Sequence, residues 1–275
     1  MTEMDHDPAP PTISLTAVEF DVLWEHLRPG RMPLAVKVPS PGRTHEERTR
    51  LAMEVWASLA ERRLGRPGAL DDDLVGLITA LGRPDVELDG RLWLSGRQVR
   101  VIAAITGDVG VRAVLDGGSL RLTPVVRTGL TRAVLDVLPA RPPGLGSSVT
   151  LRSADLDQAA KAAGRDPAAL ARLLAGTELR PSDAETLGNM VRGAGDRGQF
   201  GSASRNAWGR RLRAPRVVAF FDTPNGRYLQ SRREAADGTE WSTVAPASIR
   251  MLYHQVEELL TDPAERPVEF PLFVS

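Results

Sequence analysis

The glycines in segment 193–198 have the G-x-G-x-x-G spacing that can bind a dinucleotide. Such a fingerprint holds a pyrophosphate only where it follows a strand and opens a helix in a β-α-β unit. Here it follows a helical pattern that carries Leu187, Met190 and Val191, and no parallel strand precedes it. We therefore predict a loop that ends a helix, with no nucleotide or other cofactor site.

Histidines and aspartates are the remaining candidates for metal or acid–base chemistry. The four histidines, at positions 6, 26, 45 and 254, lie in separate segments and lack the H-E-x-x-H spacing that holds zinc. Segment 71–73 is three aspartates, which suit a helix N-terminus better than a cation. The chain contains no cysteine, which excludes disulfides and Cys nucleophiles. We predict no metal site, no catalytic residues and no enzymatic activity.

Seven arginines lie between Arg192 and Arg216, with Asp196 as the one acidic residue among them and Phe200 and Trp208 interleaved. Arginines with aromatic residues suit base stacking on a nucleic acid, and they are equally enriched at protein interfaces. A third interpretation is a solvated helix face beside core aromatics. The chain has 35 basic and 35 acidic residues, and this zero net charge favours a protein partner over a nucleic acid.

The elements that position these residues begin with helices. Thr16 with Glu19, and Thr44 with Glu47, are capping boxes that open two helices. We expect the first helix to end at residues 28–30, Arg-Pro-Gly, and the second to be broken at 65–68. Asp71 predicts the start of a third helix. From Val86 the apolar period changes to two, which predicts four strands joined by short turns, and hence an antiparallel meander. The predicted strands are 86–94, 99–106, 110–116 and 119–123, followed by a helix over 125–138.

The pattern restarts after segment 139–148, PARPPGLGSS, whose proline and glycine content is typical of a linker. A short strand at 149–151 precedes helices at about 153–163, 167–175 and 182–194. Residues 217–229 predict a β-hairpin around Pro224-Asn225-Gly226, in which both faces of the apolar first strand must be covered. A strand at 240–244 and a helix at 247–260 follow.

The two halves share one order of elements, and segment 100–113 aligns without a gap to segment 216–229. We therefore predict a duplicated, pseudo-twofold α+β fold, with a central antiparallel sheet flanked by two helical subdomains. The expected parts are a disordered lead-in (1–12), an N-terminal half (13–138), a linker (139–148), a C-terminal half (149–262) and a tail (263–275). The two halves are expected to form one compact domain.

A distinctive motif comprises RGQFG at 197–201, WGRR at 208–211 and APRVVAFFDTPNGRYL at 214–229. This motif resembles the EspG family of ESX, or type VII, secretion-associated proteins, and the similarity extends over about residues 13–262. The resemblance implies the pseudo-twofold α+β fold described above. It also implies a non-enzymatic, cytosolic chaperone. Mycobacterial members of the family bind the PPE subunit of PE–PPE heterodimers at its exposed apolar helical tip.

The resemblance favours a chaperone that binds a PPE-like secreted protein, keeps it soluble and targets it for secretion. Our candidate partner-binding residues are Met190, Gln199, Phe200, Arg205 and Trp208. The alternative is a nucleic-acid-binding protein that uses the cluster Arg192–Arg216, whose affinity would fall steeply with salt. The polar N-terminus lacks a signal-peptide pattern and no apolar run reaches about 20 residues, so we expect a cytoplasmic protein without membrane insertion.

Overall fold

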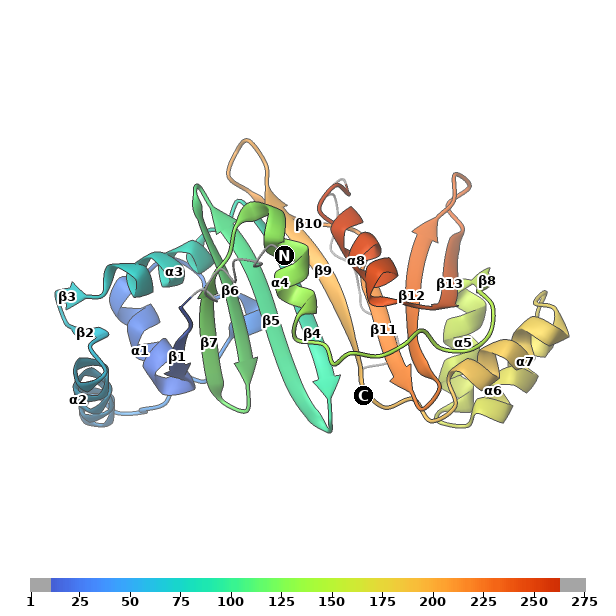
Figure 1. Cartoon of the computed structure of the whole chain (residues 1–275), viewed down its shortest axis with the longest axis horizontal. Coiled ribbons are helices and arrows are strands. Elements are labelled where there is room, and N and C mark those ends of the chain that lie inside the picture. Colours follow the sequence, from blue (N-terminus) through green and yellow to red (C-terminus); the bar gives the residue numbers. More distant parts are fainter. Residues whose placement is uncertain (1–10, 263–275) are drawn as a thin grey trace, which may run out of the picture.

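In the computed structural model, which describes residues 11–262, the predicted strands pair into one antiparallel sheet (Figure 1). The order across the sheet is β1-β7-β6-β5-β4-β9-β11-β12-β13-β8, with β10 paired to β9 at one end. The strands are β1 (Ile13–Thr16), β4 (Val86–Leu94), β5 (Arg97–Thr106), β6 (Val109–Asp116), β7 (Ser119–Pro124), β8 (Val149–Arg152), β9 (Arg197–Arg205), β10 (Arg211–Arg213), β11 (Val218–Thr223), β12 (Gly226–Glu234) and β13 (Glu240–Pro246).

Eight α-helices of the described chain flank this sheet. They are α1 (Ala17–Leu27), α2 (His45–Glu61), α3 (Asp72–Gly82), α4 (Leu130–Leu135), α5 (Ser153–Ala163), α6 (Pro167–Ala175), α7 (Pro181–Met190) and α8 (Ile249–Glu258). Two 3₁₀ turns (η1, Leu34–Val36; η2, Arg127–Gly129) and a small hairpin (β2, Gly65–Arg66; β3, Ala69–Leu70) complete the set. The α+β architecture with a large antiparallel sheet and flanking helices is thus confirmed.

The helices cover the two faces of the sheet differently. Helices α4 and α8 lie across the middle of one face, while α1–α3 occupy one end of the molecule and α5–α7 the other (Figure 1). Because successive strand residues point to opposite faces, neighbouring residues belong to different parts of the core. Val101 and Phe220 pack under α4 and α8. Ile102 packs with α1 and α3, and Phe221 packs with α5–α7. Phe220 and Phe221, on opposite faces of β11, are therefore both buried, as predicted for its apolar sequence, whereas Ala219 is partly exposed.

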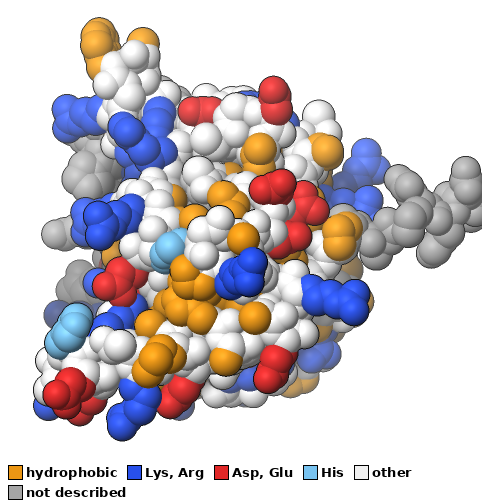
Figure 2. Space-filling model, turned by 90° about the vertical axis from the view of Figure 1, so that its left-hand side faces the viewer, with side chains coloured by type: hydrophobic (Ala, Val, Ile, Leu, Met, Phe, Trp, Pro, Cys, Tyr) orange, Lys and Arg blue, Asp and Glu red, His pale blue; other side chains and the backbone are white. Residues whose placement is uncertain are grey.

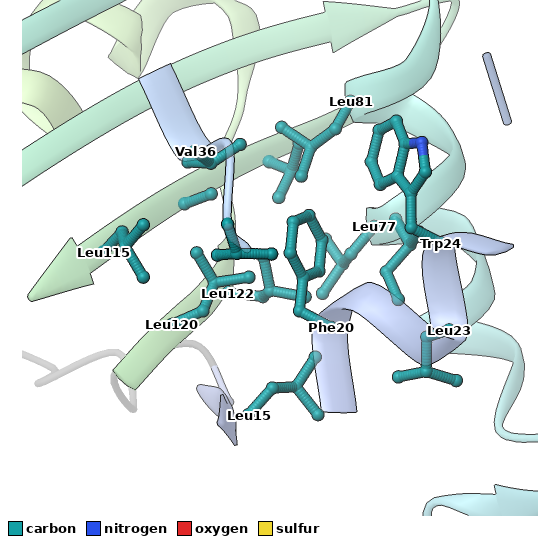
Figure 3. Close-up of a cluster of buried hydrophobic side chains, with 14 of the residues drawn as sticks. Leu15, Phe20, Leu23, Trp24, Val36, Leu77, Leu81, Leu115, Leu120 and Leu122 are labelled. Atoms are coloured by element: carbon teal, nitrogen blue, oxygen red, sulfur yellow. The ribbon is translucent and has the colours of Figure 1, made fainter. Parts of the chain in front are cut away.

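The N-terminal core forms between α1, α3, η1 and the strands β5–β7. Figure 3 shows Phe20 and Trp24 of α1 pointing towards Leu77 and Leu81 of α3, with Leu115 of β6 and Leu120 and Leu122 of β7 on the other side of the cluster. The Phe20 and Trp24 rings meet edge to face, with centroids 5.3 Å apart. The helical spacing of these apolar residues in the sequence thus corresponds to a buried helix face.

The first capping box supports a buried carboxylate. The N–H of Thr16, the hydroxyl of Ser58 and the guanidinium of Arg62 all donate hydrogen bonds to Glu19, at 2.7, 2.8 and 3.0 Å. Burial alone would raise the pKa of Glu19, but these bonds outweigh it and hold the pKa below its ordinary value of 4.5. Ionised Glu19 therefore stabilises the fold.

We expect Glu19→Gln to lower the free energy of unfolding by about 1–3 kcal/mol at pH 7, because charged hydrogen bonds are lost. Since the pKa of folded Glu19 is depressed, its contribution is present above the unfolded pKa and disappears as the pH falls through the folded pKa. Urea unfolding at pH 7 and pH 3 should show a difference between variant and wild type that shrinks at low pH. A difference that does not change with pH would contradict this assignment.

Three segments differ from the sequence-based expectation. Strand β9, in the middle of the sheet, begins at Arg197, so the last two residues of the glycine-rich segment 193–198, which we expected to be loop alone, belong to a strand. The helix predicted over 125–138 is reduced to η2 and α4. Segment 139–148 follows the start of β12, where Arg227 donates its N–H to Pro142 and accepts from the N–H of Gly144, at 2.8 and 2.9 Å. Residues 1–10 of the expected lead-in and the tail 263–275 lie outside the described residues.

Candidate partner-binding groove

A groove of about 690 Å³ crosses the middle of the sheet on the face opposite α4 and α8. Five neighbouring strands, β5, β4, β9, β11 and β12, form its floor, and the turn between α5 and α6 contributes Arg165. The lining of the groove includes the side chains of Arg91, Trp93, Arg197, Gln199, Val217, Ala219, Phe221, Gln230 and Arg232. These residues come from both halves of the chain and meet because β4 pairs with β9.

The floor of the groove is largely apolar. Ala219 and Phe221 face it from β11, and Trp93 faces it from β4. The Phe221 ring stacks on Tyr228 at 5.2 Å, and the Tyr228 hydroxyl exchanges hydrogen bonds with the backbone of Leu145, so this part of the floor is rigid. Trp93 keeps 43% of its surface exposed. An apolar floor left open to solvent is typical of a surface that binds another protein.

Cationic side chains surround this floor. The Arg197 guanidinium lies over the Trp93 ring, 5.9 Å from its centroid. Arg91 lies two residues before Trp93 on the same face of β4. Burial, followed by the like charge of Arg91, lowers the pKa of Arg100 on the adjacent strand. Several positive charges therefore lie close together on this face. The groove can hydrogen-bond to carbonyl or carboxylate oxygens while it covers apolar groups.

The structure distributes the five predicted partner-binding residues over different surroundings. Gln199 lies on the groove floor. Its neighbour Phe200 points to the other face, where it is fully buried against Phe220 beneath α8, because successive strand residues alternate. Met190 is buried in the core of α5–α7. Arg205 and Trp208 belong to the β9–β10 hairpin, outside the groove lining.

The β9–β10 hairpin presents Trp208 to solvent with 88% of its surface exposed. The Asn206 side chain accepts hydrogen bonds from the N–H groups of Trp208 and Arg210, at 3.1 and 3.0 Å, and Arg205 donates to the carbonyl of Gly209 at 2.7 Å. In Figure 1 this connection extends beyond the sheet next to β10. Hydrogen bonds thus hold the turn that presents this exposed indole.

Three of the seven arginines in the cluster form ion pairs within the fold. Arg211 pairs with Glu87, and Arg213 makes two bonds to Asp89, at 2.6 and 3.0 Å. Arg216 pairs with both Glu258 and Asp262. These acidic partners come from β4 and from the end of α8. They lie far from the arginines in the sequence, so the segment 192–216 alone contains the basic residues without their partners. The cluster therefore does not form the continuous basic face that nucleic-acid binding requires.

The end of the molecule formed by α1–α3 carries a second apolar surface. Figure 2 shows hydrophobic side chains gathered in the middle of this end, among charged ones. Partly buried side chains of α2 and its neighbours contribute to this end, including Trp56, whose ring meets His26 edge to face with centroids 4.9 Å apart. The groove differs from this surface in combining an apolar floor with a hollow, so it is our candidate site.

Within residues 11–262, no group of three or more His, Asp or Glu side chains is arranged to hold a metal ion. The helices of the same region are all too short or too polar to cross a membrane. The acidic segment 71–73 instead caps α3, where the Asp71 side chain accepts the N–H of Leu74 at 2.9 Å.

Sequence reasoning missed most of the groove. Arg91, Trp93 and Ala219 were assigned only to strands, because no local motif marks them. The available signal was the alternation in β4, where Leu88, Leu92 and Leu94 share one face and Arg91 and Trp93 lie on the other. A Trp at a position that alternation places opposite the core indicates a functional face.

Comparison with known proteins identifies the family. The model of the EspG family matches residues 16–258. A solved structure described as the Mycobacterium tuberculosis type VII secretion system chaperone EspG5 in complex with a PE25–PPE41 dimer contains a chain that superposes with a TM-score of 0.71, at 16% identity, over 93% of this chain and 98% of that chain. A comparison with curated proteins finds no match. The chain belongs to the EspG family, a family of type VII secretion chaperones and not of enzymes.

Proposed function

We propose that this chain is a cytoplasmic chaperone that binds the apolar helical tip of a PPE-like protein in the groove on the sheet. The client would be one subunit of a PE–PPE-type heterodimer, kept soluble and directed to its type VII secretion system. The observation that carries the proposal is a solvent-open apolar groove, built from both halves of an EspG-family chain. The complex of EspG5 with PE25–PPE41 supports the class of client.

The chemistry of the groove fits the end of a helical hairpin. The tip of such a hairpin exposes apolar side chains, which are an aggregation hazard in water. It also exposes the last carbonyl groups of a helix, which lack intrahelical partners. The apolar floor at Ala219 and Phe221 would cover the side chains. The side chains of Arg91, Arg197 and Gln199 carry N–H donors suited to those carbonyls.

Among our candidate residues, Gln199, Arg205 and Trp208 would contact the client. Gln199 lies on the floor, and the β9–β10 hairpin would extend the contact beyond the sheet with Trp208 as an anchor. The roles proposed for Phe200 and Met190 are indirect, because both are buried. Phe200 supports β9 from the opposite face, where its ring fills the space left by Gly90.

The proposal includes an internal duplication that makes the groove a junction between halves 13–138 and 149–262, connected through 139–148. The strand order supports it, because β1-β7-β6-β5-β4 from one edge corresponds to β8-β13-β12-β11-β9 from the other. The buried faces of the strands favour a correspondence between the two halves that is shifted by one residue from the gapless alignment of segments 100–113 and 216–229. Val101, and not Ile102, shares the α4–α8 face with Val218. A one-residue shift reverses every side chain, so the faces decide the register.

Co-expression with a PPE-like client from the same genome tests the function. We expect the client to move from the insoluble to the soluble fraction and to co-purify with this chain as a stable complex. Such an interface would bury on the order of 1,600 Å² in total. The control is co-expression of the same client with the variant Ala219→Trp, whose added indole fills the groove. Failure of every PE–PPE-type pair of that genome to form a complex would refute the proposal.

A further inference from the structure

The described chain ends at the mouth of a second hollow that adjoins the groove. This hollow, about 500 Å³, is lined by residues of the loop before β11, by the ends of β12 and α8, and by Asp262 itself. It shares Val217 and Arg232 with the groove. The two hollows therefore adjoin at these two residues, near the start of β11.

Ion pairs fix the point where the chain leaves α8. The Arg216 side chain donates to both carboxylate oxygens of Asp262, at 2.5 and 3.2 Å, and to Glu258 at 3.3 Å. Arg216 precedes Val217, which lines both hollows. Asp262, the last described residue, thus lies beside the groove, although α8 itself packs on the opposite face of the sheet.

The sequence of residues 263–275, PAERPVEFPLFVS, matches the chemistry of the groove. Its second half is rich in apolar residues, with Phe270, Leu272 and Phe273 close together, and would suit the apolar floor. Glu265 and Glu269 outnumber Arg266, so the side chains of the segment carry a net negative charge, opposite to that of the arginines around the floor. An extended segment of this length spans roughly 40 Å, whereas five adjacent strands are about 20 Å wide. The segment is long enough to cross the groove from its starting point.

We infer that residues 263–275 dock in the groove when no client is bound, as an occupant tethered to the same chain. The prolines at 263, 267 and 271 favour an extended segment that lies over the sheet face instead of a helix. Tethering gives the segment an effective concentration of the order of millimolar, so weak contacts suffice to fill the site. The segment would shield the apolar floor from water and yield it to a client that binds more tightly.

Cross-linking tests this docking in the free protein. The chain has no cysteine, so introduced pairs report without background. We would combine Ala219→Cys on the groove floor with Phe273→Cys, and treat the protein with a short bismaleimide at low protein concentration. The matched control combines Phe273→Cys with Met53→Cys, an exposed position on α2. We expect at least fivefold more intramolecular product for the first pair, seen as a mobility shift and identified by peptide mass.

Equal yields for the two pairs would overturn the inference, and so would product found only between two chains. A second measurement covers the regulatory consequence, which rests on the proposed function. If the segment fills the groove nine-tenths of the time, deletion of residues 263–275 should tighten client binding about tenfold. Unchanged affinity would show that segment and client do not compete. The cross-linking result needs no client, so it stands or fails independently of the chaperone function.

Discussion

Replacing Asp222 by Asn is expected to reduce the free energy of unfolding by about 3–5 kcal/mol. Asp222 and Arg227 form an ion pair inside the fold, with relative side-chain exposures of 4% and 1% and two bonds of 2.8 Å. The Arg227 guanidinium also lies over the Phe220 ring and donates to the carbonyl of Pro139. In the variant a buried cation loses its counter-charge, and no route to water compensates it.

The measurement is urea unfolding at pH 7, followed by circular dichroism and tryptophan fluorescence. Glu87→Gln is the matched control, because it also removes a buried carboxylate that pairs with arginine. Its partner Arg211 is 44% exposed and can turn towards water. Burial raises the pKa of Glu87 despite the attraction of Arg211, so its charge is poorly stabilised by the fold. We expect a loss of no more than about 1 kcal/mol for the control, and equal losses in both variants would contradict the argument.

The regular elements of this fold are encoded locally and were predictable. Both threonine capping boxes occur where the sequence placed them, and so do the turns between β4, β5, β6 and β7. The central strand β9 was not predictable in the same way. Its sequence RGQFGSASR is small and polar, with Phe200 as its one large apolar residue. It is a strand because it completes the sheet between β4 and β11, and Gly90 leaves room for Phe200.

The groove could be predicted only in part, since it exists only after β4 and β9 pair across more than 100 residues of sequence. Motif reasoning selected residues of β9, and one of them, Gln199, lines the groove. It could not decide which face each residue occupies, and so it included Phe200. The salt bridges of Arg211 and Arg213 could not be predicted either, because their partners Glu87 and Asp89 lie on a strand that is distant in the sequence.

Filling the groove should abolish its function while the fold persists. Ala219 lies on the floor, between Gln199 of β9 and Gln230 of β12 in the sheet register. Ala219→Trp would place an indole next to Phe221, in the part of the groove that we propose binds the client. We expect client affinity to fall at least 100-fold, which corresponds to about 2.7 kcal/mol. Isothermal titration calorimetry with a purified PE–PPE-type heterodimer would measure it.

Ala162→Trp provides the control, because Ala162 is exposed on α5 and absent from the groove lining. It adds the same indole without reducing the hollow, so it should bind the client like wild type. Both variants should show circular dichroism spectra and thermal midpoints close to wild type, since the groove opens to solvent and the added ring need not enter the core. A folded Ala219→Trp protein that still bound its client with wild-type affinity would place the interface elsewhere. The exposed hairpin at Trp208 and the α1–α3 end would then be the surfaces to test, because each presents an aromatic side chain outside the core.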